Sequence, residues 1–268
     1  MAYRNFTCPG FASQGHTVAH WMEWMEEQAD ILIPVAPHHE RSCLLCHGSS
    51  GYLDGGTDTW ARCLHCHRYG DVIDRFIPIT YSIDAGLESM LHRYKDRGVA
   101  WLRYPLSSLL HTFVQDHADC IDDEAGGVDV ATIVPSDNQD RTFSHLDFLL
   151  RGAISGDPAF ARFEWDLEFL TRDRTTTRPA RGALKPSAYE VAPFVVKGSS
   201  VLVLDDTWTS GSSTASVAAA LKEAGALEVT VLTLGRQMKA DGDWGSTQAI
   251  CVDRRGEVWR HDECVLCA

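Results

Sequence analysis

Apolar and polar residues alternate along the second half of the chain in blocks that predict strands and helices in turn. Residues 201–204 are all apolar, as in a strand that is buried on both faces of a parallel sheet. Residues 210–225 repeat apolar positions at helical spacing, with Val217, Ala218, Leu221 and Ala224 on one face. Further strands are predicted over 128–134, 189–196 and 229–234, and a further helix begins near residue 141. This alternation favours βαβ units and therefore an α/β fold with a mainly parallel sheet.

Amphipathic helical patterns dominate the first half of the chain. Residues 16–32 carry an apolar stripe, and Pro34 and Pro37 end that pattern. Its polar face carries four carboxylates, which an anionic membrane surface would repel, so we expect this helix to pack against the protein itself. A second helix is predicted over 84–97, and a third begins at Pro105.

The end of the sequence, residues 249–267, is predicted to be a hairpin that turns at Arg255-Gly256. We therefore divide the chain into three parts. Residues 1–78 hold the N-terminal helix and a cysteine-rich segment, residues 79–248 hold the α/β domain, and residues 249–268 form a cysteine-rich hairpin.

Charge and composition narrow the classes of function. The 268 residues include 24 Lys and Arg against 37 Asp and Glu, and the formal charge of −13 makes a general nucleic-acid binder an unfavoured class. The sequence has no apolar run of membrane-spanning length, and residues 1–15 lack the basic start and apolar block of a signal peptide. We therefore expect a cytoplasmic protein with no membrane partner. In that compartment nine cysteines indicate metal or thiol chemistry before disulfides.

Four cysteines form two CxxC pairs, Cys43 with Cys46 and Cys63 with Cys66, and sixteen residues separate the pairs. Four thiolates at this spacing predict a closed tetrahedral zinc site, which is structural because it leaves no position for water. Residues 41–75 carry no net charge, whereas a zinc ribbon that grips DNA is normally basic. We therefore interpret this segment as a zinc ribbon that serves as a scaffold.

The two pairs also fit a second interpretation. His47 and His67 turn each pair into a CxxCH motif, the pattern of covalent c-type haem attachment. Haem attachment needs export, for which the sequence carries no signal, so zinc is the preferred interpretation.

Three further cysteines, Cys251, Cys264 and Cys267, lie in the tail. With His261 or Cys8 as a fourth ligand they predict a second zinc site, and free or buried thiols are the alternative.

The candidate ligand site follows the strand at 201–204. Asp205 and Asp206 come where that strand ends, and open α/β sheets bind their ligands at the carboxyl ends of strands. The turn around Gly211 then leads into a helix, whose free N–H groups and neighbouring hydroxyls suit a phosphate. Two adjacent carboxylates suit a cation or the hydroxyls of a sugar.

Two other segments suit anions. Residues 170–185 carry five basic residues against one acidic residue, and a flexible basic loop can close over a polyanion. The strand predicted at 128–134 ends in a loop that feeds the N-terminus of a helix.

The string at 201–214 resembles the phosphoribosyl pyrophosphate (PRPP) signature of type I phosphoribosyltransferases, which is four hydrophobic residues, two acids and a Thr/Ser/Gly phosphate loop. With a zinc ribbon before it, the chain resembles the ComF family, and the resemblance covers residues 43–236. Lys95 and Gly98 are similar to a short Lys-x-x-Gly element of that family. Val134-Pro135 and Arg141-Thr-Phe-Ser are similar to its pyrophosphate loop and its Arg-Gly-Phe-Asn string. Arg172, Arg174 and Thr176 are similar to its mobile basic loop.

Some residues depart from the family pattern. Asp137 and Asp140 stand where more basic residues are usual, and Thr142 replaces the glycine of Arg-Gly-Phe-Asn. These departures affect the pyrophosphate and acceptor region and leave the phosphate loop intact.

The resemblance implies a type I phosphoribosyltransferase core and a pentosyl glycosyltransferase activity. The enzyme would transfer the 5-phosphoribosyl group of PRPP to a small-molecule nucleophile, with Mg²⁺, and release pyrophosphate. Asp205 and Asp206 would contact the ribose hydroxyls and magnesium-bound water, and Arg172 or Arg174 would meet the leaving group. The remaining PRPP contacts that it implies are Lys95, Ser136, Asp137, Thr207, Thr209, Ser210, Gly211, Ser212 and Ser213.

Two other functions stay open at this point. The first keeps the fold without the chemistry, as a PRPP-binding or competence-type accessory protein. The second is a redox or haem protein built on the cysteine pairs. The sequence leaves the acceptor and the oligomeric state open.

Overall fold

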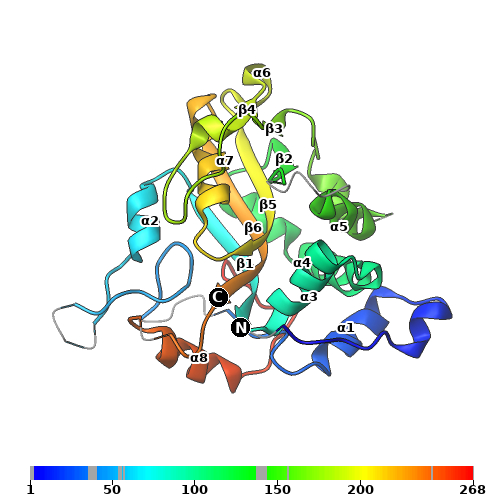
Figure 1. The fold of residues 1–268 in the computed structure, drawn as a ribbon. Helices are drawn as coiled ribbons and strands as arrows, with labels where there is room; N and C mark the ends of the chain where they lie inside the picture. Colours follow the sequence, from blue (N-terminus) through cyan, green and yellow to red (C-terminus); the bar gives the residue numbers. More distant parts are fainter. Residues whose placement is uncertain are drawn as a thin grey trace.

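A parallel four-stranded sheet forms the centre of the protein, as Figure 1 shows for the computed structural model. The structure describes residues 3–35, 41–53, 56, 58–136, 144–155, 157–242 and 244–267. The strand order is β1 (Arg75–Ile83), β6 (Glu228–Met238), β5 (Ser200–Trp208) and β2 (Val130–Ile133). A short antiparallel pair, β3 (Leu170–Arg172) and β4 (Tyr189–Val191), lies outside this sheet.

Helices cover both faces of the sheet (Figure 1). Helices α3 (Gly86–Arg97), α4 (Arg103–Glu124) and α5 (His145–Ile154) lie on one face, and α7 (Ser212–Glu223) lies on the other. Helix α1 (Val18–Glu26) packs on α4. The remaining helices are α2 (Leu64–Tyr69), α6 (Pro193–Val196) and α8 (Thr247–Arg255). The prediction of an α/β fold with helices around a parallel sheet is confirmed.

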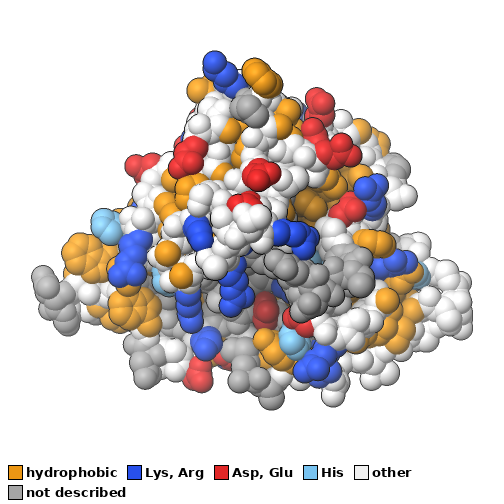
Figure 2. Space-filling view, turned by 45° about the horizontal axis from the view of Figure 1, so that its top comes forward, with side chains coloured by type: hydrophobic (Ala, Val, Ile, Leu, Met, Phe, Trp, Pro, Cys, Tyr) orange, Lys and Arg blue, Asp and Glu red, His pale blue; other side chains and the backbone are white. Residues whose placement is uncertain are grey.

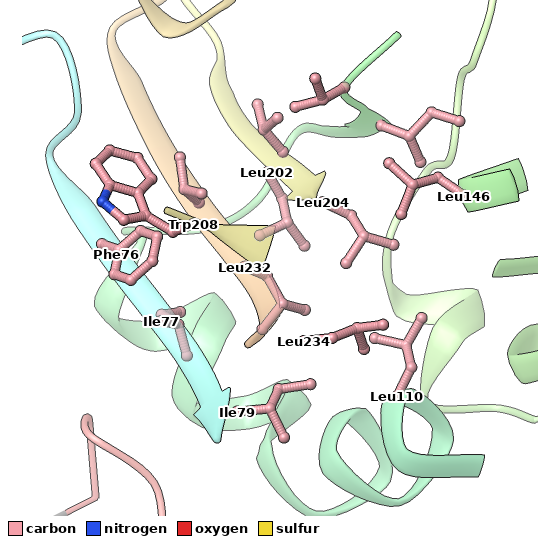
Figure 3. Packing of buried hydrophobic residues seen from close by; sticks show 14 of the residues in the cluster. Phe76, Ile77, Ile79, Leu110, Leu146, Leu202, Leu204, Trp208, Leu232 and Leu234 are labelled. Carbon is pink, nitrogen blue, oxygen red and sulfur yellow. The ribbon is translucent and has the colours of Figure 1, made fainter. Parts of the chain in front are cut away.

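Buried aliphatic side chains join the sheet to the helices on the α4 side. Figure 3 shows Leu202 of β5 and Leu232 of β6 in one cluster with Leu110 of α4 and Leu146 of α5. All four side chains are buried. Because β5 is buried on both faces, its uniform apolar pattern follows directly from its central place in the sheet.

Both edges of the sheet are covered by other parts of the chain. Along β1, the Ile33 carbonyl accepts the Tyr81 N–H at 2.9 Å and the Trp259 indole donates to the Ile79 carbonyl at 3.1 Å. Along β2, Ala131 exchanges backbone hydrogen bonds with residues 164–166. Pro78 is tolerated within β1 because an edge strand does not need every N–H for a neighbouring strand.

The structure changes several predicted elements. The helix predicted over 16–32 is shorter: it ends at Glu26, turns follow it, and Ile33 reaches the edge of β1. The strand predicted over 189–196 stops at Val191, because Pro193 favours the first turn of a helix and has no N–H for a strand. Strand β1 was not predicted, and the domain boundary placed after residue 78 falls inside it.

The predicted hairpin in the tail is wrong. Residues 247–255 form helix α8, whose buried residues Thr247, Ile250 and Cys251 follow helical spacing rather than alternation. Among the described residues, helices that combine the length and apolarity needed to cross a membrane are absent.

Candidate functional site

A cleft of about 1080 Å³ opens at the carboxyl ends of β5 and β2. It gathers residues from the end of α3, the segment after β2, the segment 178–181 and the turn between β5 and α7. Most residues that sequence reasoning assigned to PRPP line this one cleft: Lys95, Ser136, Asp205, Asp206, Thr207, Thr209, Ser210, Gly211, Ser212 and Ser213. Asp137, also assigned to PRPP, lies outside the described residues.

The two carboxylates occupy different environments although they are neighbours. Asp205 accepts hydrogen bonds from the Thr214 hydroxyl and from the Asp206 N–H. Asp206 is paired with Lys95, at 3.0 Å, and with the His145 ring. Burial and the charge of Asp206 raise the pKa of Asp205 to about 7. Burial also disfavours the charged form of Asp206, but Lys95 and His145 outweigh it and hold the pKa of Asp206 far below its usual range.

Stability should therefore depend on pH through Asp205. Its folded pKa of about 7 lies above the unfolded value of about 3.9, so the folded protein binds more protons between these limits. The stabilising contribution of the protonated group is full below pH 4 and is lost as the pH rises through 7. We expect Asp205→Asn to raise the free energy of unfolding at pH 8 by roughly 1 to 4 kcal/mol, at about 1.4 kcal/mol per pKa unit. Urea unfolding of both proteins between pH 5 and 8 measures this difference.

A matched control is Asp123→Asn, which removes an exposed carboxylate on α4 outside the cleft. This variant should keep the wild-type pH dependence. An unchanged pH dependence in Asp205→Asn would contradict the assignment to Asp205.

The turn before α7 is shaped by Gly211. Its φ of 78° lies in the left-handed region, and a Cβ there would come within 2.1 Å of the Trp208 ring. The turn therefore needs glycine, and it leads directly into the N-terminus of α7, whose first-turn N–H groups and dipole suit an anion.

Two distant segments fix this turn from either side. The Tyr69 hydroxyl, on α2, donates to the Ser210 carbonyl at 2.6 Å. The Ser212 hydroxyl accepts the Gly182 N–H at 2.7 Å, and the Ser216 hydroxyl accepts the Lys185 N–H at 2.8 Å. The cysteine-rich segment and the basic segment thus both support the candidate phosphate loop.

Arg172 and Arg174 do not take the places expected of them. The Arg172 guanidinium binds its own loop, with the Ala188 carbonyl at 2.8 Å and the Thr176 carbonyl at 3.2 Å. Arg174 is exposed and does not line the cleft. Arg178 and Arg181, from the same basic segment, line it instead. The prediction of a basic segment beside the site thus agrees with the structure, but the residues that face the site differ.

His145 is a site residue that sequence reasoning missed. It is the first residue of α5, follows the N-cap Ser144, and reaches the Asp206 carboxylate while almost fully buried. The available signal was its position at the start of the helix that follows the β2 loop.

The four cysteines of the ribbon converge on one point. All four are buried, and their sulfur atoms lie within 4.8 Å of one another, with 3.8 Å between Cys46 and Cys63. A tetrahedron with Zn–S bonds of about 2.3 Å has edges of about 3.8 Å, so these thiols fit one zinc ion. Convergence of both pairs on a single point is incompatible with a separate haem on each pair.

Arg236 connects the ribbon to the candidate phosphate loop. Its buried guanidinium donates to the Cys46 carbonyl at 3.1 Å and lies 3.5 Å from the Cys46 sulfur. It also donates to the carbonyls of Trp208, at 3.1 Å, and Thr209, at 3.3 Å. One side chain at the end of β6 therefore holds both segments.

The second cysteine group differs from the predicted one. Cys264 and Cys267 lie with His117 and Cys120 of α4, and these four residues can hold a metal ion. Cys251 instead points from α8 into a small apolar cluster with Tyr81 and Ile83. The His261 ring pairs with Asp116 at 2.6 Å.

The ribbon also presents an apolar surface. Figure 2 shows hydrophobic side chains gathered on the left of the molecule, over the ribbon. Exposed Leu44, Trp60 and Leu64 line a groove there together with Trp244, which precedes α8. These side chains are exposed and are therefore not part of the buried core around the four cysteines.

Comparison with known proteins gives limited information. No family model and no curated protein matches the chain. Nine chains of solved structures do match. One is described as the structure of the allosteric regulatory enzyme of purine biosynthesis, with 21% identity and a TM-score of 0.27. The match covers 46% of this chain and only 26% of that enzyme's length, and similarity at this level carries no conclusion about activity.

Proposed function

We propose that this protein binds PRPP with Mg²⁺ and transfers the 5-phosphoribosyl group to a small-molecule nucleophile, with release of pyrophosphate. One observation carries the proposal. A single cleft brings together two buried carboxylates, a hydroxyl-rich turn at a helix N-terminus, and cationic side chains. These are the groups that a sugar carrying a phosphate at one end and a pyrophosphate at the other requires.

The 5′-phosphate would bind at the turn before α7. Gly211 gives the backbone its left-handed bend, and the hydroxyls of Thr209, Ser210 and Ser213 border the same part of the cleft. Tyr69 and Gly182 bond to this turn and hold its shape. A turn held by such bonds has less conformational freedom to lose when a ligand binds.

The ribose and the metal would bind at Asp205 and Asp206. The two carboxylates suit Mg²⁺, because burial and the charge of Asp206 raise the pKa of Asp205 and a bound cation would stabilise the charged form of both groups. When bound, Mg²⁺ would neutralise charge on the pyrophosphate. Lys95, Arg178 and Arg181 add three cationic groups at the same cleft, suited to the pyrophosphate oxygens.

The reaction breaks the bond between C1′ and the pyrophosphate oxygen, and the electron pair leaves with the pyrophosphate. The nucleophile supplies the pair of the new bond to C1′ and releases its proton, where it has one, to an oxygen of the departing pyrophosphate. Carboxylates beside the ribose stabilise the positive charge that develops on the sugar as the bond breaks. Residues 178–181 border the cleft, and their closure over PRPP would exclude water from the cation.

Phosphorus NMR of PRPP with Mg²⁺ tests this proposal. Wild type supplied with a cell-extract fraction should release pyrophosphate, whereas Asp205→Asn/Asp206→Asn should not. Each carboxylate would lose a charge-assisted interaction of about 1.5 to 3 kcal/mol, so together they should account for a factor of about 10² to 10⁴. The control Asp123→Asn, which changes an exposed carboxylate, should release pyrophosphate as wild type does.

A binding protein without turnover is the second candidate. Asp206 is already paired with Lys95 and His145, so in this arrangement its carboxylate is engaged within the protein. PRPP lines that broaden with wild type alone, without pyrophosphate release, would support that candidate against the transferase. If wild type neither broadens the PRPP lines nor releases pyrophosphate, both candidates are excluded.

A further inference from the structure

We infer that His117, Cys120, Cys264 and Cys267 form a second zinc site, with three thiolates and one imidazole, that fastens the segment after α8 onto α4. The four ligand atoms lie within 4.8 Å of one another. His117 and Cys120 are three residues apart on α4 and therefore share one face of the helix. Cys264 and Cys267 form a CxxC pair, the same unit that occurs twice in the ribbon.

The orientation of His117 supports metal binding. Its Nε2 lies 2.8 Å from the His261 carbonyl, an acceptor that requires the ring proton on Nε2. The lone pair is therefore on Nδ1, which lies 3.3 Å from the Cys267 sulfur and 3.8 Å from the Cys120 sulfur. Zinc-ligating histidines characteristically donate their other N–H to a carbonyl or carboxylate in this manner.

In both CxxC units a backbone N–H points at the sulfur of the first cysteine, although from different positions of the turn. In the ribbon the Cys46 N–H points at the Cys43 sulfur at 3.5 Å, and in the tail the Leu266 N–H points at the Cys264 sulfur at 3.3 Å. An N–H directed at sulfur stabilises a thiolate, the form that binds zinc. Both cysteine groups thus have a backbone N–H directed at a cysteine sulfur, although their ligand sets differ.

A disulfide accounts for these residues less well than a metal does. The Cys267 sulfur is equally close, at 2.9 Å, to the sulfurs of Cys120 and Cys264, whereas a disulfide joins one pair only. These separations lie between a disulfide bond of about 2.05 Å and the edge of about 3.8 Å of a zinc tetrahedron, so the symmetry of the group and not its S–S distances favours a metal. Either disulfide would leave one thiol and the oriented His117 ring unused. One tetrahedral ion uses all four groups.

The site explains how a largely polar segment stays in place. Arg260, Asp262 and Glu263 are exposed, and Trp259 and Val265 are the main apolar anchors of this segment. Binding zinc joins it to α4 across more than a hundred intervening residues, which contributes folding free energy as structural zinc sites do. The Trp259 indole is thereby kept against the edge of β1.

Elemental analysis of the full chain tests the inference. Wild type should hold two zinc ions per chain, and Cys120→Ser and His117→Gln should each hold one. Cys251→Ser is the matched control, because Cys251 is a buried tail cysteine outside the cluster, and it should keep two. One zinc in wild type, or two in both ligand variants, would overturn the second site.

Cobalt(II) titration of the metal-free wild type gives an answer even if a variant does not fold. Two equivalents should bind, one with the spectrum of four thiolates and one with that of three thiolates and an imidazole. Binding of a single equivalent of cobalt(II), with the spectrum of four thiolates, would contradict the second zinc site. Mass spectrometry of protein prepared without reductant gives a further test. A mass two hydrogens below that of the reduced chain would reveal a disulfide and would also contradict the inference.

Discussion

Exchanging Cys46 for serine should abolish zinc binding in the ribbon and unfold that segment. A structural zinc site contributes about 10 to 16 kcal/mol of apparent binding free energy, comparable to the whole stability of about 5 to 15 kcal/mol of a typical domain. Cys46 is completely buried, and its carbonyl and sulfur both meet Arg236. The loss should therefore extend to the candidate phosphate loop. Zinc content and thermal unfolding measure the first effect, and PRPP binding measures the second.

Cys8→Ser is the control for this variant. Cys8 is exposed and belongs to neither cysteine group, so zinc content and melting temperature should match wild type. A Cys46→Ser protein that kept the wild-type melting temperature with one zinc ion fewer would show that the ribbon does not need its metal.

Arg236→Met should lower the free energy of unfolding by about 3 kcal/mol or more. Methionine fills much of the same space, but it leaves the buried carbonyls of Cys46 and Trp208, and the partly buried carbonyl of Thr209, without their donor. Each buried acceptor left unpaired costs about 1 to 3 kcal/mol. Because two of these carbonyls begin the turn before α7, PRPP should also bind more weakly. Urea unfolding and a PRPP titration measure the two effects.

Arg178→Met is the control that separates the effect on PRPP binding from the effect on stability. Arg178 is exposed and lines the same cleft, so its exchange should weaken PRPP binding while stability stays within about 0.5 kcal/mol of wild type. If Arg236→Met behaved like Arg178→Met, Arg236 would be a surface cation for the ligand and not the link between ribbon and loop.

The parts of the fold that were predictable from the sequence carry their signals locally. The strand before Asp205 is a block of apolar residues, and the helix after Gly211 has a regular apolar stripe. Strand β1 escaped prediction because Pro78 and Thr80 interrupt its pattern, and only its edge position makes the proline acceptable. The tail was misjudged because a few apolar residues fit both a short strand and a helical turn.

The site residues likewise fall into those that are contiguous in the sequence, which were predicted, and those that only the fold brings together. Residues from Asp205 to Ser213 are contiguous, so one string predicted them together, and all of them except the buried Trp208 line one cleft. His145 and Arg181 reach the cleft from separate elements. The sequence marked the two segments that carry them as suited to anions, but it did not indicate which side chain of each segment faces the cleft. His117 and Cys120 likewise meet the tail cysteines only after folding. Long-range juxtaposition of this kind leaves no periodic trace in one sequence.

The covered sheet edges constrain how this protein can associate. A strand from another chain adds to a sheet by bonding to free backbone groups along an edge strand. Here the Ile33 and Trp259 contacts occupy β1, and residues 164–166 occupy β2. These contacts block strand addition at Ile79, Tyr81 and Ala131, so we expect recognition of a second copy or another protein to use side chains rather than an extension of the sheet. The apolar face of the ribbon, with Trp60 and Trp244 exposed, offers such side chains.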